Sequence, residues 1–459
     1  MKISTIRKSI IVIFWLLVWQ LGALLISNDI VLAGPYEVCL SLVGLIIKWD
    51  FWKTILISLG KIGLGFLVAF LSGVILGILS HMSDFVKDIL SPLISVLKSI
   101  PVASFVVLLL LWAGGESLSF LIVLLIAFPH IYIGILKGLE NTNKDILVMA
   151  DSYDFSYFEK CIYIYRDALR PTLLASIETS LGLAWKSGVA AEVIALPDYS
   201  IGTKIYMSKI YLDTPMLFAW TLVVILLSFI FEKAMMFLVK RAFNVKPCPS
   251  KGRVKNEKTA SFKEVKNSIK TQEGEAQDIE VIEKINDINV AYGENKVLEN
   301  VSLELELGQI YTIMAPSGKG KTTLINEISR RTKHSVSMMF QEDRLLEDYD
   351  VITNVILGAT NITKGECEAI IKKLLPAECI FNPCNNLSGG MKRRVALLRS
   401  VLRTSDYLIL DEPFSGLDDE SKNKCIDFIH EYQKGRTVII VTHEEDDEKA
   451  LNAKRLDCI

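Results

Sequence analysis

The apolar residues of this chain are gathered in its first half. Mainly hydrophobic runs fill positions 10–243, whereas charged residues dominate from about position 246 onward. A helix needs about 20 mainly apolar residues to cross a bilayer. The segments that approach this length are 10–27, 58–80, 89–112, 117–136, 172–196 and 215–239. We therefore predict an α-helical membrane domain of about six helices over residues 1–245, in contact with the lipid bilayer, followed by a soluble half.

Lysine and arginine predict the orientation of these helices. Positively charged residues favour cytosolic loops. The N-terminus is basic, the loop 137–171 is basic, and Lys240 and Arg241 follow the last apolar run. Because an even number of crossings returns the chain to its starting side, these three regions agree with one another. We expect a multi-pass protein of the plasma membrane with both termini in the cytosol.

The soluble half has two parts. Residues 246–280 are polar, highly charged and almost free of aromatic residues, so they cannot bury a core and read as a linker. From Ile282, short β-rich runs alternate with helical ones, which predicts an α/β domain over residues 281–459. The formal net charge of −2 argues neither for nor against nucleic acid, and we expect no nucleic-acid partner.

The segment "QIYTIMAPSGKGKTTLINEIS" reads as a strand, a glycine loop and a helix, as in a phosphate-binding P-loop. Backbone N–H groups and the helix N-terminus would cradle the phosphate oxygens of ATP. Lys321 would reach the β and γ phosphates, and the Thr322 hydroxyl would bind Mg²⁺. The nucleotide-binding residues of this loop are Ala315, Pro316, Ser317, Gly318, Lys319, Gly320, Lys321, Thr322 and Thr323.

A second motif, "DYLILDEP", is an apolar run that ends in two carboxylates. It predicts a buried strand that delivers Asp411 and Glu412 to its C-terminal edge. Asp411 suits the coordination shell of Mg²⁺, and Glu412 suits a general base that polarises the attacking water. A P-loop alone would predict only nucleotide binding, but "LSGGM" stands about twenty residues before "LILDEP", and the combination is very specific.

This combination resembles the ATP-binding cassette (ABC) transporter family over essentially the whole soluble half. The resemblance implies a P-loop NTPase fold, hydrolysis of ATP, and a role for each matching residue. Tyr292 would stack on adenine, Gln341 would contact Mg²⁺ or water, and His443 would be the switch histidine. The signature residues that would close on ATP held by a partner cassette are Ser388, Gly389 and Gly390, with Asp418 in the following D-loop.

Two departures from the family pattern bear on activity. Ala315 stands in place of the first P-loop glycine, and an alanine forced into a left-handed conformation would cost about 1–2 kcal/mol. Only about twenty residues separate Lys321 from Gln341, so most of a small antiparallel β subdomain is missing by comparison with the family. A cassette that binds ATP without efficient hydrolysis therefore stays open as an alternative.

Residues 30–240 resemble the permeases of nitrate/sulfonate/taurine-type ABC importers. The likeness is carried by "KSIPVASFVVLLLLWAGG", "VMADSYDFSYFEKCIYIYRDALRPTLLASI" and "GLAWKSGVAAEVIA". It implies that the middle segment is a coupling helix that docks on the cassette. The usual pattern there is Glu-Ala-Ala, three residues and then Gly. Here Ala150 fills the third position and Asp154 takes the place of the glycine, in a turn that aspartate tolerates.

The predicted helix 172–196 carries three charged residues, Glu178, Lys186 and Glu192. At 100° per residue they fall within an arc of about 120°, so they can share one face. Charges at bilayer depth usually face a bundle interior or a watery path, which makes these residues candidates for the translocation path. The alternative is that both glutamates lie near the membrane interfaces and only Lys186 lies deep.

Together these features predict a permease and an ATPase fused end to end. We expect ATP-driven import of a small solute, possibly a sulfonate, nitrate or a vitamin precursor, received from a separate extracellular substrate-binding protein. Because the signature must meet the P-loop of a partner cassette, we expect a homodimer. The alternatives are an ABC exporter and a soluble ABC regulator with a membrane anchor. Short inside loops disfavour the exporter, and the charged fifth helix disfavours the anchored regulator.

Overall fold

The computed structural model describes residues 2–26, 28, 30–244, 249, 282–292, 295–316 and 318–456. The chain divides into two compact units. The first consists of residues 1–142 and 165–245, and the second of residues 143–164 and 246–459. Apart from Pro249, the predicted linker 246–280 lies outside the described residues.

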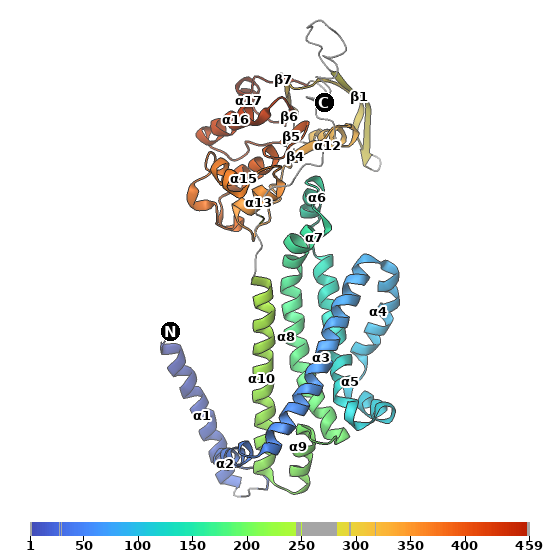
Figure 1. The fold of residues 1–459 in the computed structure, drawn as a ribbon, viewed down its shortest axis with the longest axis vertical. Coiled ribbons are helices and arrows are strands. Elements are labelled where there is room, and N and C mark those ends of the chain that lie inside the picture. The colour runs from blue at the N-terminus through green and yellow to red at the C-terminus, as the bar shows by residue number, and fades with distance from the viewer. Residues whose placement is uncertain are drawn as a thin grey trace. The chain divides into compact units, whose positions relative to one another are not determined.

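The first unit is helical in the part that the structure describes (Figure 1). Its helices are α1 (Lys2–Ile26), α2 (Pro35–Ile46), α3 (Trp49–Met82), α4 (Asp84–Ser99), α5 (Val102–Glu140), α8 (Arg166–Ala195), α9 (Ile201–Ile210) and α10 (Thr214–Asn244). Helices α3, α5 and α8 pack against one another around a buried apolar cluster. Glycines allow this close approach, since a Cβ on Gly77 would lie 2.7 Å from Ile135, and one on Gly134 would lie 2.1 Å from Ser176.

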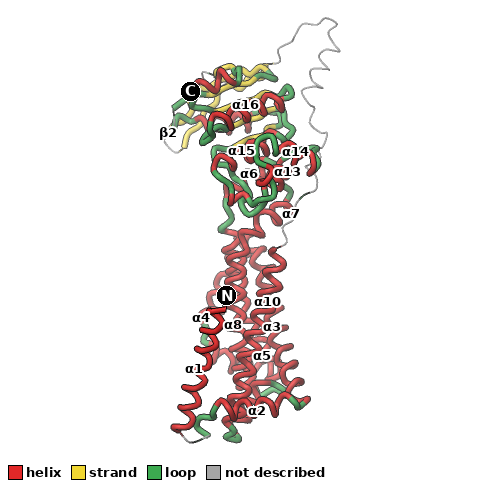
Figure 2. Tube along the Cα trace, turned by 90° about the vertical axis from the view of Figure 1, so that its left-hand side faces the viewer, coloured by secondary structure: helices red, strands yellow, loops and turns green. Residues whose placement is uncertain are grey.

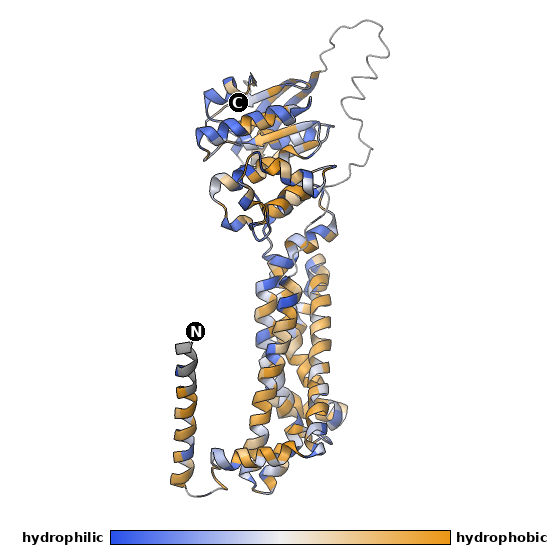
Figure 3. Cartoon of the chain, turned by 60° about the vertical axis from the view of Figure 1, so that its left-hand side comes forward, coloured by the Kyte–Doolittle hydropathy of each residue, from blue (hydrophilic) through white to orange (hydrophobic). Residues whose placement is uncertain are grey.

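Three helices among the described residues, α3, α5 and α10, are long and apolar enough to cross a membrane. They coincide with the second, fourth and sixth predicted spans. The first and fifth predicted spans form helices α1 and α8. Figure 3 shows hydrophobic residues over most of the length of the helices of this unit.

The predicted third span, 89–112, is not one helix. Helix α4 ends at Ser99, Ile100 is extended with ψ 126°, and Pro101 precedes the start of α5. Proline causes this break because it disfavours the helical conformation of the residue before it. The second half of the predicted span joins the fourth in α5, with a kink at Gly114 (φ 73°, ψ 172°).

The second unit contains an α/β domain and the short helices α6 (Lys144–Ser152) and α7 (Tyr157–Lys160), followed by a π-helical turn, η1 (Cys161–Tyr165), whose last residue belongs to the first unit (Figure 2). Its strands are β1 (Ile282–Tyr292), β2 (Asn295–Glu306), β3 (Ile310–Ile313), β4 (Val336–Met339), β5 (Tyr407–Asp411), β6 (Thr437–Val441) and β7 (Lys454–Arg455). Its other helices are α12 (Lys321–Arg331), α13 (Val351–Gly358), α14 (Lys364–Ile371), η2 (Ala377–Cys379), η3 (Cys384–Asn386), α15 (Gly389–Val401), α16 (Asp419–Gln433) and α17 (Glu445–Ala450).

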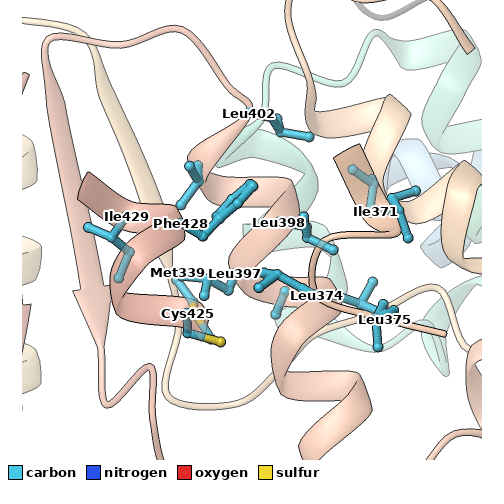
Figure 4. Close-up of a cluster of buried hydrophobic side chains, with 14 of the residues drawn as sticks. Met339, Ile371, Leu374, Leu375, Leu397, Leu398, Leu402, Cys425, Phe428 and Ile429 are labelled. Carbon is cyan, nitrogen blue, oxygen red and sulfur yellow. The ribbon is translucent and has the colours of Figure 1, made fainter. Parts of the chain in front are cut away.

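Strands β3 to β7 form a parallel sheet in the order β4-β5-β6-β3-β7, and β1 and β2 form a separate antiparallel pair. Strands β5 and β6 are buried along their whole length, as expected for a parallel sheet covered on both faces. Leu408 and Leu410 face a core that includes α15 and α16, part of which Figure 4 shows. Tyr407 and Ile409 face the opposite core, which includes α12 and residues of the segment 143–164.

Candidate functional site

The residues of the predicted ATP site lie at the carboxyl edge of the parallel sheet. Gln341 follows β4, Asp411 ends β5 and Glu412 comes next, and His443 follows β6. The P-loop leaves the neighbouring strand β3 and runs into α12. Because parallel strands all end at the same edge, residues far apart in the sequence meet there, which is where ligands bind in open α/β sheets.

The P-loop has the backbone that a phosphate cradle needs. Gly318 and Gly320 have positive φ angles of 81° and 88°, and helix α12 begins directly after them at Lys321. A Cβ on Gly320 would also lie 2.8 Å from a methyl carbon of Val297. Ala315 does not adopt a positive φ angle, so this alanine carries no left-handed strain.

The remaining residues of the loop are placed as follows. Lys319 N–H donates to the Pro316 carbonyl over 3.4 Å, and Thr323 lies half-buried on the first turn of α12. Ser317 lies outside the described residues. Tyr292 ends β1, and its side chain also lies outside what the structure describes.

Two other predicted residues, Lys321 and Glu412, lie against the ring of His443. Its Nε2 lies 2.8 Å from Glu412 Oε1, and its ring nitrogens lie 2.8 and 3.0 Å from Lys321 Nζ. The tautomer of the ring sets which of these contacts His443 donates and which it accepts. Lys321 also donates to the Ala315 carbonyl over 2.7 Å. Burial lowers the pKa of the Lys321 ammonium, while the charges of Glu412 and Asp411 act to raise it.

Two of the three expected Mg²⁺ ligands, Thr322 and Asp411, are adjacent. The Thr322 hydroxyl donates to Asp411 Oδ2 over 3.1 Å. Burial raises the pKa of Asp411, and the hydrogen bond from Thr322 partly opposes that rise. A buried carboxylate beside a hydroxyl fits a hard cation that prefers oxygen ligands. The described residues hold no group of three or more His, Cys, Asp or Glu that could bind a metal, so Mg²⁺ would need the phosphates of ATP as further ligands.

The signature residues lie apart from the P-loop in this single chain. Ser388 is the exposed N-cap of α15, and its Oγ accepts from Met391 N–H over 3.4 Å. Gly389 and Gly390 begin that helix, and Asp418 is the exposed N-cap of α16. A hydrogen bond from Ser421 lowers the pKa of Asp418. Among the described residues, no hydrogen bond joins these four to the P-loop. Their exposure at helix N-termini leaves them available to a phosphate.

The segment 143–164 belongs to the same compact unit as the cassette. Met149, Ala150 and Tyr153 are fully buried in the core that includes strand β4. Asp154 has φ 53° and ends helix α6, with Phe155 N–H bonded to the Ala150 carbonyl over 2.8 Å. This is the hydrogen-bond pattern of a helix that ends in a left-handed residue, so aspartate here makes the turn that glycine usually makes.

Two ion pairs and a hydrogen bond accompany this packing. Asp145 pairs with Arg344 at 3.1 Å, and Asp154 pairs with Arg403. The Tyr153 hydroxyl donates to the carbonyl of Met338 over 2.9 Å. Met338 lies on β4, the edge strand of the sheet, so the segment covers an edge that would otherwise be open.

The three charged residues of α8 have different environments. Glu178 and Lys186 are exposed in the single chain, whereas Glu192 is fully buried. Glu192 Oε2 accepts from Ser58 Oγ over 2.9 Å and from Gly202 N–H over 3.1 Å. Gly202 lies in the first turn of α9, so Glu192 caps that helix. A role for these residues in a translocation path stays a prediction.

The sequence motifs did not single out the residue that ties the site together. Arg393 is 5% exposed and donates to the carbonyls of Gln341 (2.8 Å) and Glu412 (2.7 Å). It is the fifth residue of α15, three positions after the second glycine of the signature. No sequence signal distinguishes it, because α15 also carries Lys392, Arg394 and Arg399.

Two family models match the chain. The model described as "ABC transporter" matches residues 298–415, and the model described as "Binding-protein-dependent transport system inner membrane component" matches residues 65–244. An aliphatic sulfonates import ATP-binding protein of Paracoccus denitrificans is 33% identical over 183 residues, which cover 36% of this chain and 74% of that protein. The chain therefore belongs to the ABC transporter family. More particularly, it joins an importer-type permease to an ABC cassette in one polypeptide.

A second relative and a solved structure are also similar to the cassette. A methionine import ATP-binding protein of Lactobacillus johnsonii is 30% identical over 209 residues, which cover 37% of this chain and 60% of that protein. A solved dimeric bacterial ABC transporter cassette is 23% identical, covers 37% of this chain and 91% of that chain, and gives a TM-score of 0.32. The chain thus spans less than two thirds of the methionine import protein.

Proposed function

We propose that this chain hydrolyses ATP to import a small solute across the plasma membrane, as a homodimer that receives its substrate from a separate binding protein. The observation that carries the proposal is the cluster of Lys321, Thr322, Asp411, Glu412 and His443 at one sheet edge. The match of residues 65–244 to a permease of binding-protein-dependent transport supports import.

The chemistry follows from the geometry of the cassette. The P-loop amides and Lys321 would hold the phosphates of ATP, and Mg²⁺ held by Thr322 and Asp411 would neutralise phosphate charge. Glu412 would accept a proton from the attacking water, and His443, bonded to it at 2.8 Å, would hold its carboxylate in place. The signature of a second copy would close on the same nucleotide. Gln341 is exposed after β4, where it could contact the water or Mg²⁺.

The coupling segment supplies the link to transport in this proposal. Ala150 and Asp154 place the segment 143–164 against β4, the strand that leads to Gln341. A side chain larger than alanine at position 150 has no space there, because Ala150 is fully buried. We therefore expect Ala150→Arg to remove the stimulation of ATP hydrolysis by a loaded binding protein, and to remove uptake with it.

The substrate class rests on likeness alone. Relatives of the cassette are named for import of aliphatic sulfonates, methionine and Fe(3+) ions, and another is named for arginine transport. The permease half resembles importers of small anions, so a sulfonate is our first candidate, followed by nitrate and by a vitamin precursor. Another relative of the cassette is named for macrolide export, and an exporter is therefore the second candidate function.

Reconstitution in liposomes separates these possibilities. Chains whose cassettes face ATP sealed inside should accumulate an external sulfonate when its binding protein is added outside. The Glu412→Gln variant in matched liposomes is the control for uptake that does not depend on hydrolysis. Outward-only movement, or stimulation by a hydrophobic compound without any binding protein, would replace the importer with the exporter. Phosphate release by the wild type no faster than from ATP without protein would favour a cassette that binds ATP without hydrolysing it.

A further inference from the structure

The catalytic carboxylate stands on an unusual backbone. Glu412 has φ 51°, a left-handed angle that is uncommon for a residue other than glycine. Its N–H continues the sheet by donating to the Val441 carbonyl over 2.9 Å. Its carbonyl needs a partner on the other side. Backbone angles of this kind persist only where the surroundings hold them in place, and such positions concentrate at functional sites.

Arg393 supplies that partner. Its Nε and Nη2 both donate to the Glu412 carbonyl, over 3.1 and 2.7 Å, and Nη2 also donates to the Asp411 carbonyl. On its other side, Nη1 donates to the carbonyls of Phe340 (3.1 Å) and Gln341 (2.8 Å). One guanidinium therefore ties the ends of β4 and β5 together. A lysine ammonium cannot do this, because it lacks the planar fork of five donors.

Asp343 connects Arg393 to a second buried arginine. The Asp343 carboxylate accepts from Arg393 Nη1 over 2.9 Å, and the Asp343 carbonyl accepts from Arg399 Nη2 over 2.9 Å. Arg399 also donates to the Arg344 carbonyl over 3.0 Å. Arg399 is 2% exposed, so the main chain just after Gln341 is held by two buried guanidinium groups that share one aspartate.

Tyr153 of the segment 143–164 packs against Arg399, the second of these buried arginines. The Arg399 guanidinium lies over its ring, 5.1 Å from the centroid, and the Arg403 guanidinium lies 5.4 Å away. Its hydroxyl bonds the Met338 carbonyl of β4, as described above. Gly358 leaves the space for this arrangement, since a Cβ there would lie 2.4 Å from the Arg399 side chain and 3.2 Å from the Tyr153 ring.

We infer that Arg393 is a positioning residue that holds Glu412 in register with Gln341, and that Tyr153 acts on it through Arg399 and Asp343. We name these four residues, Tyr153, Arg399, Asp343 and Arg393, the arginine relay. The inference rests on the proposed ATPase function and adds to it the route by which the segment 143–164 sets the position of the general base. All four residues lie in one compact unit.

The test uses the full-length protein in lipid nanodiscs, with ATP hydrolysis measured across ATP concentrations. Arg393→Lys keeps the charge and should lower kcat about a hundredfold, the size of effect that a small misplacement of a reacting group produces. The KM for ATP should change by less than about threefold, because the P-loop is untouched. In a Glu412→Gln background, Arg393→Lys should cause no further loss, because the residue that it positions has already been disabled.

The matched control is Arg436→Lys. Arg436 is also a buried arginine, and its partners among the described residues are main-chain carbonyls, those of Gln433, Arg403, Val401 and Tyr432. Arg436→Lys should lower the thermal stability of the cassette about as much as Arg393→Lys does, while leaving kcat within about twofold of the wild type. Asp343→Asn and Tyr153→Phe are milder relay variants in case Arg393→Lys does not fold, and each should lower kcat in the wild type but cause no further loss in the Glu412→Gln background.

Two outcomes overturn the relay in different ways. If the wild type hydrolyses ATP and Arg393→Lys matches Arg436→Lys in kcat, the relay is wrong and the ATPase proposal stands. If the wild type releases phosphate from ATP no faster than a reaction without protein, the ATPase proposal fails, and hydrogen exchange then decides on the relay. Arg393→Lys should speed amide exchange in residues 340–344 and 411–413, and unchanged exchange there would overturn the relay without reference to activity.

Discussion

The ATP site and helix α8 both carry charged residues that stand out in the sequence, and the fold treats the two sets differently. In the cassette, Lys321 and Glu412 lie far apart in the sequence, and each comes within 3.0 Å of the His443 ring. On α8, Glu178 and Lys186 stay exposed, and Glu192 is fully buried under the first turn of α9. A motif fixed to the end of a strand predicts where a side chain goes. Helical periodicity predicts only the angle at which it leaves the helix.

The largest effect should follow from Glu412→Gln, which tests the cassette side of this comparison. Removing the general base should lower ATP hydrolysis by at least about a hundredfold, whereas ATP binding should persist because the phosphate contacts remain. Phosphate release and nucleotide binding by the purified protein measure the two effects separately. Glu431→Gln is the matched control, since Glu431 is an exposed glutamate paired with Lys373 at 2.5 Å, away from the site. Hydrolysis near the wild-type rate in Glu412→Gln would remove its assignment as the base.

Glu192→Ala should give the next largest effect, and it tests what the comparison says of helix α8. The change would leave the Gly202 N–H and the Ser58 hydroxyl without their buried acceptor, which costs about 2 kcal/mol of stability. Thermal unfolding in detergent measures the loss. Glu192→Gln keeps an acceptor oxygen and should lose less. If Glu192→Ala unfolds at the wild-type temperature but no longer supports uptake, Glu192 lines a path and does not serve as a helix cap.

Ala315→Gly should have a smaller effect. Because Ala315 already avoids the left-handed region, a glycine there relieves no strain, and nucleotide affinity should change by less than about tenfold, or 1.4 kcal/mol. Titration with a fluorescent ATP analogue gives the affinity. A much larger gain would show that the native loop is impaired, and it would strengthen the reading of a cassette that binds ATP without efficient hydrolysis.

The smallest effect on stability should follow from Glu178→Gln and Lys186→Gln. Both side chains are exposed in the single chain, so each substitution should change the unfolding free energy by less than about 0.5 kcal/mol. Any loss of uptake in liposomes would then report on transport itself. Normal uptake by both variants would end the proposal that α8 lines the translocation path.

Magnesium should affect the stability of the cassette in a pH-dependent way. Burial raises the pKa of Asp411. Without a cation, the contribution of Asp411 to folding stability is therefore greatest at acidic pH, and it is lost as the pH rises through the raised pKa. Mg²⁺ beside the carboxylate favours the ionised form and should restore the loss. We expect Mg²⁺ with ATP to raise the melting temperature more at neutral pH than near pH 4, and an equal rise at both would contradict Asp411 as a ligand.

The sequence predicted the cassette well because its motifs are tied to strand ends. The P-loop, Asp411, Glu412 and His443 lie at the strand ends that the sequence predicts, while their roles stay predictions, and the aspartate at position 154 makes the expected left-handed turn. The break at Pro101 and the fusion of two predicted spans into α5 were missed, since apolar composition does not mark where a helix bends. Arg393 was missed because its role depends on carbonyl groups, which every residue carries and which no motif distinguishes.

The membership of residues 143–164 in the cassette unit has a consequence for how the protein is made. The ribosome releases this segment before residues 165–245, and only afterwards the residues that form the rest of the unit. Until β4 is complete, Met149, Ala150 and Tyr153 have no core to enter, and a cassette produced alone would show an uncovered strand edge and an apolar depression in their place. The second unit can therefore be completed only after residues 165–245 of the first unit have been synthesised. In this protein, synthesis of the permease precedes folding of the ATPase.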